Sequence, residues 1–353
     1  MNRIGGEFAF EKNPNTIGLT VLNRLQERPF RLFDSGRSAI RACLKMLNRS
    51  QISLPRYTCE SVVRVCEDCG YTIRFFSIAN DFSFVMEDLV SSLADRGVLL
   101  FHPYFGFPVD SAVLQQIKEA CTLYDVTIVE DTTHSFFSSV QTIGTYCIAS
   151  FRKWFPLPDG GIAYSAQELD LPLSFPRCDD FSSIRFEAMR IKSGFLQGEN
   201  DKEELFLEKF EDAEKILDTR EESYSLSSSS RGLLDTFDID GMIEKRRSNY
   251  FYLYSHLGIF SSWLTILTPF LAEGVCPMFL VISCSCRNKL RSFLRKQLIF
   301  CPVHWPEVRG YATVFSEHSM SLPIDQRYGE TDMHRLFCAI KEFADARKTQ
   351  YYS

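Results

Sequence analysis

The sequence predicts an α/β protein, with a large domain built on a mainly parallel sheet and a smaller α+β domain towards the C-terminus. Between residues 37 and 165, short apolar runs alternate with amphipathic stretches of helical length. Strands separated by such helices form βαβ crossovers, which place helices on both faces of the sheet. Beyond residue 184 the composition shifts to charged helical segments. At about 150 residues per domain, a chain of 353 residues makes about two domains.

The elements expected in the large domain follow one another in a regular order. Apolar residues recur at helical spacing over residues 37–47, as at Ile40, Leu44 and Leu47, and predict the first helix. A short strand at 52–54 and a helix at 61–69, ended by Gly70, come next. The segments that remain are strands at 71–78, 98–101 and 126–129 and helices at 87–94 and 111–124. Since ligands bind at the carboxyl ends of the strands in such sheets, the polar residues after each strand are the first candidates for chemistry.

The second half of the chain predicts longer helices. Charged residues interspersed with Phe and Leu favour long helices over 184–222. The serine-rich segment 225–230 lacks glycine, so we expect an ordered turn or helix start there rather than a flexible linker. A helix at 239–257, strands around 278–283 and a closing helix at 331–346 complete the smaller domain. We therefore expect domains at 1–235 and 236–353.

Composition and charge exclude several partners. The chain has 39 Lys and Arg against 45 Asp and Glu, a net charge of −6, and no block of like charge, so nucleic acid is not expected to bind. The first residues lack the apolar stretch of a signal peptide, and the longest apolar segment, 260–286, is interrupted by Pro269, Glu273 and Pro277. We expect a cytoplasmic protein without a membrane partner.

The twelve cysteines are expected to be reduced and to pack as small hydrophobic residues in that compartment. The pairs Cys66–Cys69 and Cys284–Cys286 have the close spacing of metal ligands. Both pairs lie inside apolar periodicity, without flanking histidines or a second pair at zinc-finger spacing. No metal site is expected.

Two candidate sites lie where a strand meets a helix. Segment 34–39 is a small-residue turn that opens a helix, and free N–H groups at the positive end of the helix dipole suit a phosphate. Ser and Gly are also common at any helix start. Segment 129–134 follows an apolar strand, and its Asp131 either holds a cationic ligand atom or caps the next helix. His134 either approaches the same ligand or is a core histidine.

The third candidate is Lys153, within segment 149–161. Its neighbours Phe151, Trp154 and Phe155 would remove water from the ammonium group, and Arg152 would add repulsion, which favours the neutral amine needed to attack a carbonyl. The alternative is a lysine that extends from an aromatic patch into solvent. The fourth candidate comprises the proline-rich turns at 300–306 and 319–325 in the small domain.

The order and spacing of these segments resemble the DegT/DnrJ/StrS family of sugar aminotransferases, which are pyridoxal-phosphate enzymes of fold type I. The resemblance covers almost the whole chain. The matching motifs are an N-terminal segment at 4–8, S-G-T-A-A-L at 35–40, P-x-Y-T at 55–58, H-x-Y-G-x-P-x-D with one inserted residue at 102–110, E-D-A-A-Q/H at 130–134, K-x6-G-G at 153–161 and S-L-P…T-x-x-D at 321–332. The lysine and aspartate segments are the most specific of these.

The resemblance implies a fold type I PLP-transferase, with a three-layer α/β/α large domain and pyridoxal 5'-phosphate as the cofactor. Lys153 would hold the cofactor as a Schiff base and later move the substrate proton. Asp131 would pair with the pyridinium nitrogen, and His134 would lie on the hydroxyl side of the ring. The other implied cofactor contacts are the main chain at Gly36, Arg37 and Ser38, together with Cys59 and Ser150.

Three positions depart from the family pattern. The family's phosphate-binding serine falls at Ile148, and the nearest serine is Ser150. Where the family stacks an aromatic ring on the cofactor, this chain has Cys59, so either a cysteine packs there or another aromatic residue substitutes. Residues 227–231 replace the Asn-x-Arg segment that reaches towards a neighbouring subunit.

The resemblance implies a PLP-dependent aminotransferase that moves an amino group from L-glutamate to a keto-sugar. It further implies a nucleotide-linked acceptor, a role in polysaccharide or glycoconjugate biosynthesis, and a homodimer. A PLP-dependent sugar dehydratase is a related alternative, but that branch replaces the lysine with histidine. A regulatory or assembly protein that keeps the fold without catalysis is another. A Rossmann enzyme is disfavoured because no G-x-G-x-x-G follows a predicted strand.

Overall fold

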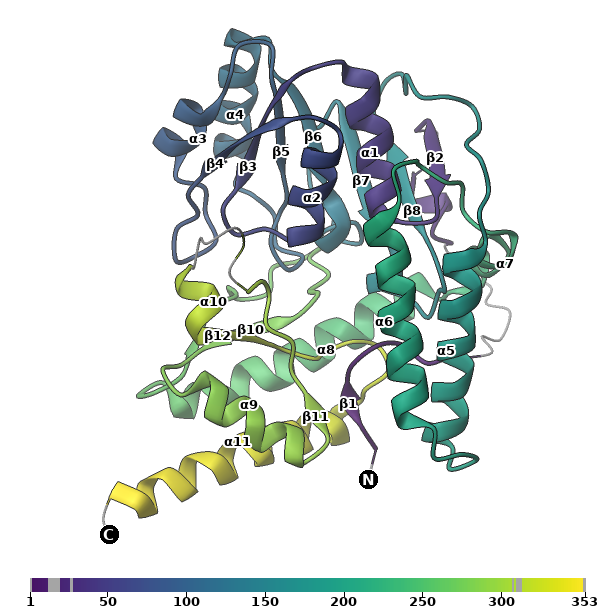
Figure 1. Ribbon diagram of the computed structural model, residues 1–353. Coiled ribbons are helices and arrows are strands. Elements are labelled where there is room, and N and C mark those ends of the chain that lie inside the picture. Colours follow the sequence, from purple (N-terminus) through teal and green to yellow (C-terminus); the bar gives the residue numbers. More distant parts are fainter. Residues whose placement is uncertain (1, 12–19, 26–27, 307, 309–312, 352–353) are drawn as a thin grey trace.

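A seven-stranded sheet organises the larger part of the computed structural model, which describes residues 2–11, 20–25, 28–306, 308 and 313–351. The strand order is β2-β8-β7-β6-β5-β3-β4 (Figure 1). Neighbours from β7 to β4 pair in parallel, and β8 runs antiparallel to both β7 and β2. The strands are β2 (Phe30–Phe33), β3 (Gln51–Pro55), β4 (Thr72–Phe76), β5 (Val98–Phe101), β6 (Thr127–Asp131), β7 (Tyr146–Ser150) and β8 (Gly161–Tyr164). The predicted mainly parallel sheet is confirmed, whereas β2, β7 and β8 were not predicted as strands.

Helices cover both faces of this sheet. Strand β5 shows why, because its four residues are all buried and alternate between the two faces. Val98 and Leu100 pack in the cluster with α1 (Gly36–Leu47) and α2 (Glu60–Asp68). Leu99 and Phe101 pack with α3 (Met86–Ser92) and α4 (Ser111–Leu123). The three-layer α/β/α arrangement follows (Figure 1).

Two long antiparallel helices follow the sheet, as the charged segment predicted. They are α5 (Asp180–Leu196) and α6 (Glu203–Thr219), and they pack through Met189, Phe206 and Phe210. In Figure 1 this hairpin runs alongside α1 and continues down past the N-terminal strand. The serine-rich segment forms α7 (Ser228–Leu233), whose N-cap Ser227 accepts a hydrogen bond from Ser230 N–H. The ordered helix start predicted there is confirmed.

The C-terminal part has its own core, around α8 (Ile239–Leu257), α9 (Arg287–Lys296) and α11 (Glu330–Tyr351). An antiparallel sheet in the order β12-β10-β9 lies against these helices, and the N-terminal strand β1 (Ile4–Gly5) pairs in parallel with β11 (Ile299–Phe300). The remaining elements are β9 (Thr265–Ile266), β10 (Leu280–Ser283), β12 (Ser319–Leu322), α10 (Val314–His318) and the 3-10 turns η1 (Asn23–Leu25), η2 (Thr132–His134), η3 (Phe151–Lys153), η4 (Leu234–Thr236) and η5 (Gly258–Phe260). The domain boundary near residue 235 stays a prediction.

All twelve cysteines are free thiols. Seven are buried in the core, including Cys43, Cys66 and Cys121, but Cys338 is exposed on α11, so the expectation that it packs is wrong. No helix within the described ranges is both long and apolar enough to cross a membrane.

Candidate functional site

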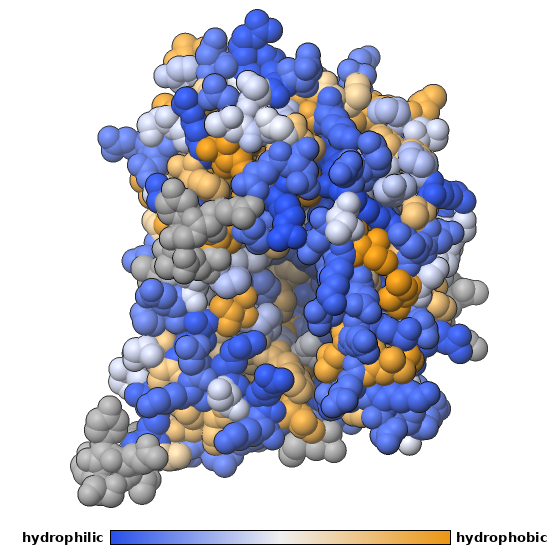
Figure 2. Space-filling view, viewed as in Figure 1, coloured by the Kyte–Doolittle hydropathy of each residue, from blue (hydrophilic) through white to orange (hydrophobic). Residues whose placement is uncertain are grey.

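A cavity of about 980 Å³ lies at the carboxyl ends of β6 and β7, where the larger part of the chain meets β11 and α9. Figure 2 shows a hollow in this face of the molecule. Seven of the eight residues predicted for the site line the cavity: Gly36, Arg37, Cys59, Asp131, His134, Ser150 and Lys153. Ser38, the eighth, lies in the first turn of α1, and its side chain is buried.

Thr133 connects the turns that carry Asp131 and Lys153. These turns leave neighbouring parallel strands, β6 and β7. The hydroxyl of Thr133 accepts a hydrogen bond from Ser150 N–H at 3.0 Å, and its carbonyl accepts one from Trp154 Nε1 at 2.6 Å. Trp154 is fully buried and lies beneath the guanidinium of Arg246. The two turns are therefore fixed to each other by buried contacts.

Lys153 is exposed to the cavity, whereas the aromatic residues beside it are buried. Phe151, Trp154 and Phe155 belong to the core cluster under the turn. The guanidinium of Arg152 forms an ion pair with Glu214 at 2.7 Å. The prediction that aromatic neighbours remove water from Lys153 is therefore wrong: the 3-10 turn η3 sends the rings inward and the ammonium group outward.

Asp131 caps a turn, which is one of the two alternatives predicted from the sequence, and it also lines the cavity; its role as the partner of a cationic ligand atom stays a prediction. Its Oδ1 accepts a hydrogen bond from Thr133 N–H at 2.9 Å. Burial raises the pKa of Asp131, and the charge of Lys153 and the bond from Thr133 oppose that rise. A cationic ligand atom beside this carboxylate would compensate the burial further.

His134 lines the cavity and is hydrogen-bonded at one of its two ring nitrogens. Its Nδ1 accepts a hydrogen bond from Phe105 N–H at 3.3 Å, which places the proton of the neutral ring on Nε2. Burial, followed by the charge of Lys153, holds the pKa of His134 well below its usual value. Trp305 stacks on this imidazole at 5.5 Å between ring centroids and 12° between planes.

Two more histidines, His102 and His304, line the cavity near Lys153. Burial first and Lys153 second lower the pKa of each to about 3, so both are neutral at pH 7. His304 Nδ1 lies 2.8 Å from Ser321 Oγ. The segments that contain His304 and Ser321 were predicted to be turns, but no role was predicted for either residue.

The first turn of α1 lies directly beside Ser150. A Cβ atom on Gly161 would lie 2.2 Å from Ser35 O, so only glycine lets β8 approach the turn this closely. Ser38 N–H donates to Ser35 Oγ at 3.1 Å, and Ser38 Oγ donates to Asp34 at 2.6 Å. Ser38 is thus used within the cap. Gly36 and Arg37 are left as the residues of this turn that line the cavity.

A charged cluster lies at the end of the cavity beside α1, and it was not predicted from the sequence. Glu214 of α6 accepts from Arg152 at 2.7 Å, Arg37 at 3.1 Å and Arg185 at 3.4 Å. Burial alone would raise the pKa of Glu214, but these three guanidinium groups outweigh it and lower the pKa to about 2. Arg185 also binds Glu7 at 2.5 Å.

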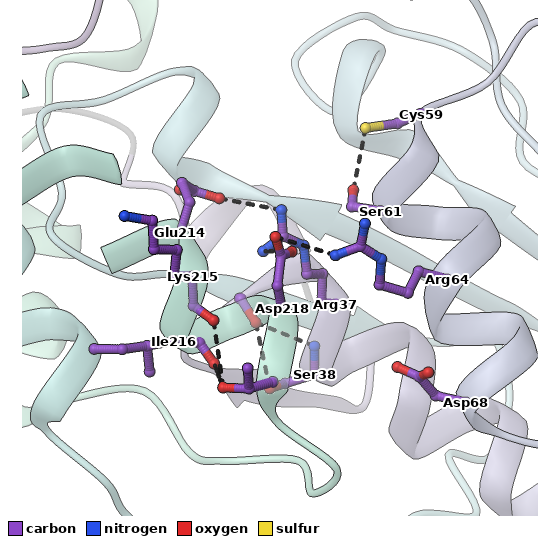
Figure 3. Close-up of polar contacts among 12 residues, drawn as sticks. Arg37, Ser38, Cys59, Ser61, Arg64, Asp68, Glu214, Lys215, Ile216 and Asp218 are labelled. Carbon is purple, nitrogen blue, oxygen red and sulfur yellow. Dashed lines mark hydrogen bonds and ion pairs between the residues drawn. The ribbon is translucent and has the colours of Figure 1, made fainter. Parts of the chain in front are cut away.

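Figure 3 shows Glu214 and the neighbouring Asp218 of α6 facing Arg37 of α1 and Arg64 of α2. No spacing signal separates Glu214 from the solvated acids of the same helix. It could not have been selected from the sequence.

Among the described residues, several buried polar atoms of cavity-lining side chains lack a hydrogen-bond partner. Besides one nitrogen each of Arg37, Arg152 and Arg185, they are Thr58 Oγ1 and His102 Nε2. Cys59, the next residue after Thr58, precedes α2, and its Sγ lies 3.1 Å from Ser61 Oγ. Because unpaired buried polar atoms are costly, this wall suits a ligand that carries polar substituents.

Asp159, in the segment that follows Lys153, connects that segment to α7. Its carboxylate accepts from Ser227 N–H at 2.8 Å and from Ser227 Oγ at 2.7 Å, and it also contacts Ser230. The segment after Lys153 is therefore tied to α7.

Within the described part of the chain, no group of three or more His, Cys, Asp or Glu residues is arranged to hold a metal ion.

No family model and no curated protein sequence matches this chain. Solved structures of aminotransferases do match it over nearly its whole length. PseC of Helicobacter pylori, an aminotransferase involved in the biosynthesis of pseudoaminic acid, has 15% sequence identity and a TM-score of 0.69, and the match covers 97% of this chain and 99% of PseC.

Two further structures agree. The putative sugar aminotransferase Spr1654 of Streptococcus pneumoniae, in its PLP form, has 15% identity and a TM-score of 0.66, with 96% of this chain and 99% of that one covered. A DegT DnrJ EryC1 StrS aminotransferase of Brucella abortus has 12% identity and a TM-score of 0.57, with 89% and 85% covered. The chain therefore has the fold type I architecture of PLP-dependent aminotransferases, as predicted.

Proposed function

We propose that this protein is a PLP-dependent aminotransferase that moves an amino group onto a keto-sugar. The observation that carries the proposal is the shared position of Lys153 and Asp131. They extend from the ends of adjacent parallel strands into one cavity, and Thr133 bonds to both turns. An amine and a carboxylate fixed in this way suit the carbonyl and the ring nitrogen of one flat cofactor.

The residues around this pair fit pyridoxal phosphate. Lys153 would bind it covalently, Asp131 would hold its ring nitrogen protonated, and the Nε2–H of His134 would donate to its ring hydroxyl. The first turn of α1 at Gly36 and Arg37, with Ser150, would hold its phosphate. Trp305 and Cys59 are the candidates for the contact against the ring face.

The bound cofactor supplies an electron sink for a carbanion, and the protein must then place a proton. Lys153, once free of the cofactor, is the cavity amine that would take the proton from one substrate carbon and return it to another. The neutral state of His102, His134 and His304 keeps positive charge away from this amine.

L-glutamate as the donor, a nucleotide-linked keto-sugar as the acceptor, a role in polysaccharide or glycoconjugate biosynthesis and a homodimeric state complete the proposal. The similarity to Spr1654, a putative sugar aminotransferase, and to PseC, an aminotransferase of pseudoaminic acid biosynthesis, supports the sugar part. Lys153 itself argues against the dehydratase alternative.

Two observations favour a second candidate, a protein of this fold with a regulatory or assembly role. Glu214 places a carboxylate beside Arg37, and Ser38 is used within the helix cap, so two features oppose a phosphate at the start of α1. The cluster as a whole is still positive, because Arg37, Arg64, Arg152 and Arg185 face the three carboxylates of Glu7, Glu214 and Asp218, and for this reason we favour the enzyme.

The test is cofactor attachment at Lys153. Purified protein incubated with pyridoxal phosphate should show the visible absorption band of a lysine-bound cofactor, and borohydride should fix the cofactor on the peptide that contains Lys153. The Lys153→Ala variant should lose both signals. Lys118→Ala, which removes a lysine from the surface helix α4, should keep them. Wild-type protein without the band or the adduct would overturn the proposal.

A further inference from the structure

Two cysteines meet at the turn that leads from β10 into α9. Cys284 follows β10, and Cys286 is the N-cap residue of α9, where its side chain makes no capping hydrogen bond. The carbonyl of Cys284 accepts a hydrogen bond from Arg287 N–H at 3.1 Å, so the chain folds back over these four residues. The turn brings Cys286 Sγ to 3.8 Å from Cys284 Sγ, and the two sulfur atoms are in contact.

An arginine is fixed beside one of these two sulfur atoms. Arg347 of α11 donates from Nη1 to Cys286 Sγ at 3.1 Å. Its guanidinium also lies over the rings of Trp263 and Phe343, 4.9 and 6.0 Å from their centroids, and these aromatic contacts hold it in place. When Cys286 reacts as a thiolate, this N–H donor stabilises the negative charge on its sulfur.

The two thiols of the pair differ in their surroundings. Cys284 is only 5% exposed, and burial, followed by the charge of Cys286, raises the pKa of Cys284 to about 12. Cys286 is half-buried. An oxidant from solvent therefore reaches Cys286 first, and Cys284 lies beside it as a protonated thiol.

The other close pair of cysteines, Cys66 and Cys69, provides a comparison within the same chain. Cys66 lies in α2 and Cys69 is its C-cap residue, and again one thiol is buried and the other half-buried. In the part of the chain that the structure describes, no hydrogen bond joins these two thiols and no arginine donates to either sulfur. The second pair is therefore matched in burial but lacks the arginine contact.

We propose that Cys284 and Cys286 form a redox-active dithiol that a peroxide converts to an intramolecular disulfide, with Arg347 as the donor that stabilises the attacking thiolate. The sulfur of Cys286 attacks one oxygen of hydrogen peroxide, the O–O bond breaks, and hydroxide leaves as the sulfur is oxidised to a sulfenic acid. The sulfur of Cys284 then attacks the sulfenic sulfur. The S–S bond forms, the S–O bond breaks, and the proton of Cys284 leaves with the hydroxide as water. Overall, two thiols and one peroxide give one disulfide and two waters.

The dithiol lies outside the proposed cofactor site but adjoins an element of it. Among the described residues that line the cavity are Asn288 of α9 but neither cysteine of the pair. Oxidation changes the residue from which this cavity-lining helix begins. In a reducing compartment such a disulfide is transient and responds to the level of oxidant. The assignment does not depend on the proposed function.

The first experiment counts thiols after oxidation of the full-length folded protein. The protein is treated with hydrogen peroxide, the excess is removed with catalase, and the remaining thiols are alkylated after unfolding. We expect the count to fall from twelve to ten per chain, and dithiothreitol to restore twelve. Peptide mass spectrometry should place the disulfide between Cys284 and Cys286. The C66A/C69A variant should still lose two thiols, whereas C284A/C286A should lose none.

Single variants test the order of reaction and the part of the arginine. In Cys284→Ala, dimedone should trap a sulfenic acid at Cys286, whereas in Cys286→Ala it should trap none at Cys284. Arg347→Gln should slow disulfide formation about fivefold at pH 7. Lys341→Gln removes an exposed cation from the same helix and should change the rate less than twofold.

Twelve alkylated thiols after oxidation, or a loss of thiols confined to the exposed Cys338, would refute the dithiol. A disulfide between Cys66 and Cys69, with the thiols of residues 284 and 286 still free, would refute it as well. Equal rates of oxidation in Arg347→Gln and Lys341→Gln would remove Arg347 from the assignment.

Discussion

At the scale of single residues, the proposed site contains side chains that stabilise a local turn or contact and also line the cavity. Asp131 uses one carboxylate oxygen to cap η2 and lines the cavity with the same side chain. His134 uses Nδ1 to accept from Phe105 N–H, and this fixes the proton on the nitrogen that remains. A conservative substitution at such a residue can keep the structural contact and remove the charge or the proton, so it tests the two roles separately.

The Asp131→Asn variant separates the two roles of this residue. Asparagine keeps an oxygen that can accept from Thr133 N–H but carries no charge. We expect the free energy of unfolding to change by less than about 0.5 kcal/mol. The rate of amino transfer from the donor should fall about 100-fold, or about 2.7 kcal/mol at 1.36 kcal/mol per tenfold. Chemical denaturation and single-turnover spectroscopy check the two quantities.

Asp131→Ala serves as the comparison, because it removes the cap as well as the charge and should lose stability too. An Asp131→Asn protein with wild-type single-turnover rates would show that the carboxylate does not pair with the cofactor.

Residue types and motif spacing selected Lys153, Asp131 and His134 as candidates, and all three line the cavity, but the direction of the lysine side chain was not predictable in detail. Three neighbouring aromatic residues suggested a buried amine. In the structure, η3 turns Phe151 and Trp154 into the core and leaves Lys153 exposed. A 3-10 turn of three residues has no periodic signal in the sequence, so the geometry becomes visible only in the fold.

At the scale of elements, the α5–α6 hairpin supplies part of the site from a distant part of the chain. Glu214 lies 61 residues after Lys153 in sequence, yet it bonds to Arg152, the neighbour of that lysine. The helices themselves were predictable, because charged residues alternate with spaced Phe and Leu. Their contact with α1 depends on tertiary packing, which has no local signature.

The Glu214→Gln variant tests what this contact stabilises. Arg37, Arg152 and Arg185 would lose their shared carboxylate, and we expect the free energy of unfolding at pH 7 to fall by about 1–2 kcal/mol. This is less than for a fully buried pair, because the Glu214 side chain is 37% exposed. The matched control is Glu211→Gln one turn earlier, where the side chain is 72% exposed and should change stability by less than about 0.5 kcal/mol.

The pH dependence of the Glu214→Gln effect has a definite sign. The folded pKa of Glu214, about 2, lies below the ordinary value of 4.5. The stabilisation by the carboxylate is therefore full above pH 4.5 and is lost as the pH falls towards 2. Urea denaturation of both proteins across this range checks it. A stability difference that grows on acidification would contradict the assignment of the cluster.

At the scale of the whole molecule, the sequence predicted most of the architecture. The β3-α2-β4 and β5-α4-β6 stretches appear where the apolar runs and helical periods indicated, because fully buried parallel strands have a strong sequence signal. The antiparallel strands β2 and β8 were not predicted. Each is four residues long, and no α-helix lies between β7 and β8 to indicate a crossover.

The cavity belongs to the same scale, since no single element encloses it. Its walls come from the turns after β6 and β7, from α6 and from α9 together with β11. The resemblance to the family predicted residues of the first wall, which the turns after β6 and β7 form. Glu214 on α6 and the cavity-lining Arg291 and Arg295 on α9 lie in helices rich in charged residues, and no sequence signal separates them from the other charged residues there.

The most direct test of the account is one turnover of amino transfer. Protein loaded with pyridoxal phosphate is mixed with glutamate in the absence of an acceptor, and the 2-oxoglutarate formed is measured alongside the visible band. We predict one equivalent of 2-oxoglutarate per Lys153 and loss of the band as the cofactor takes up the amino group. A stable band with no 2-oxo acid formed, from glutamate or from any other amino acid, would contradict the assignment of this protein as an aminotransferase.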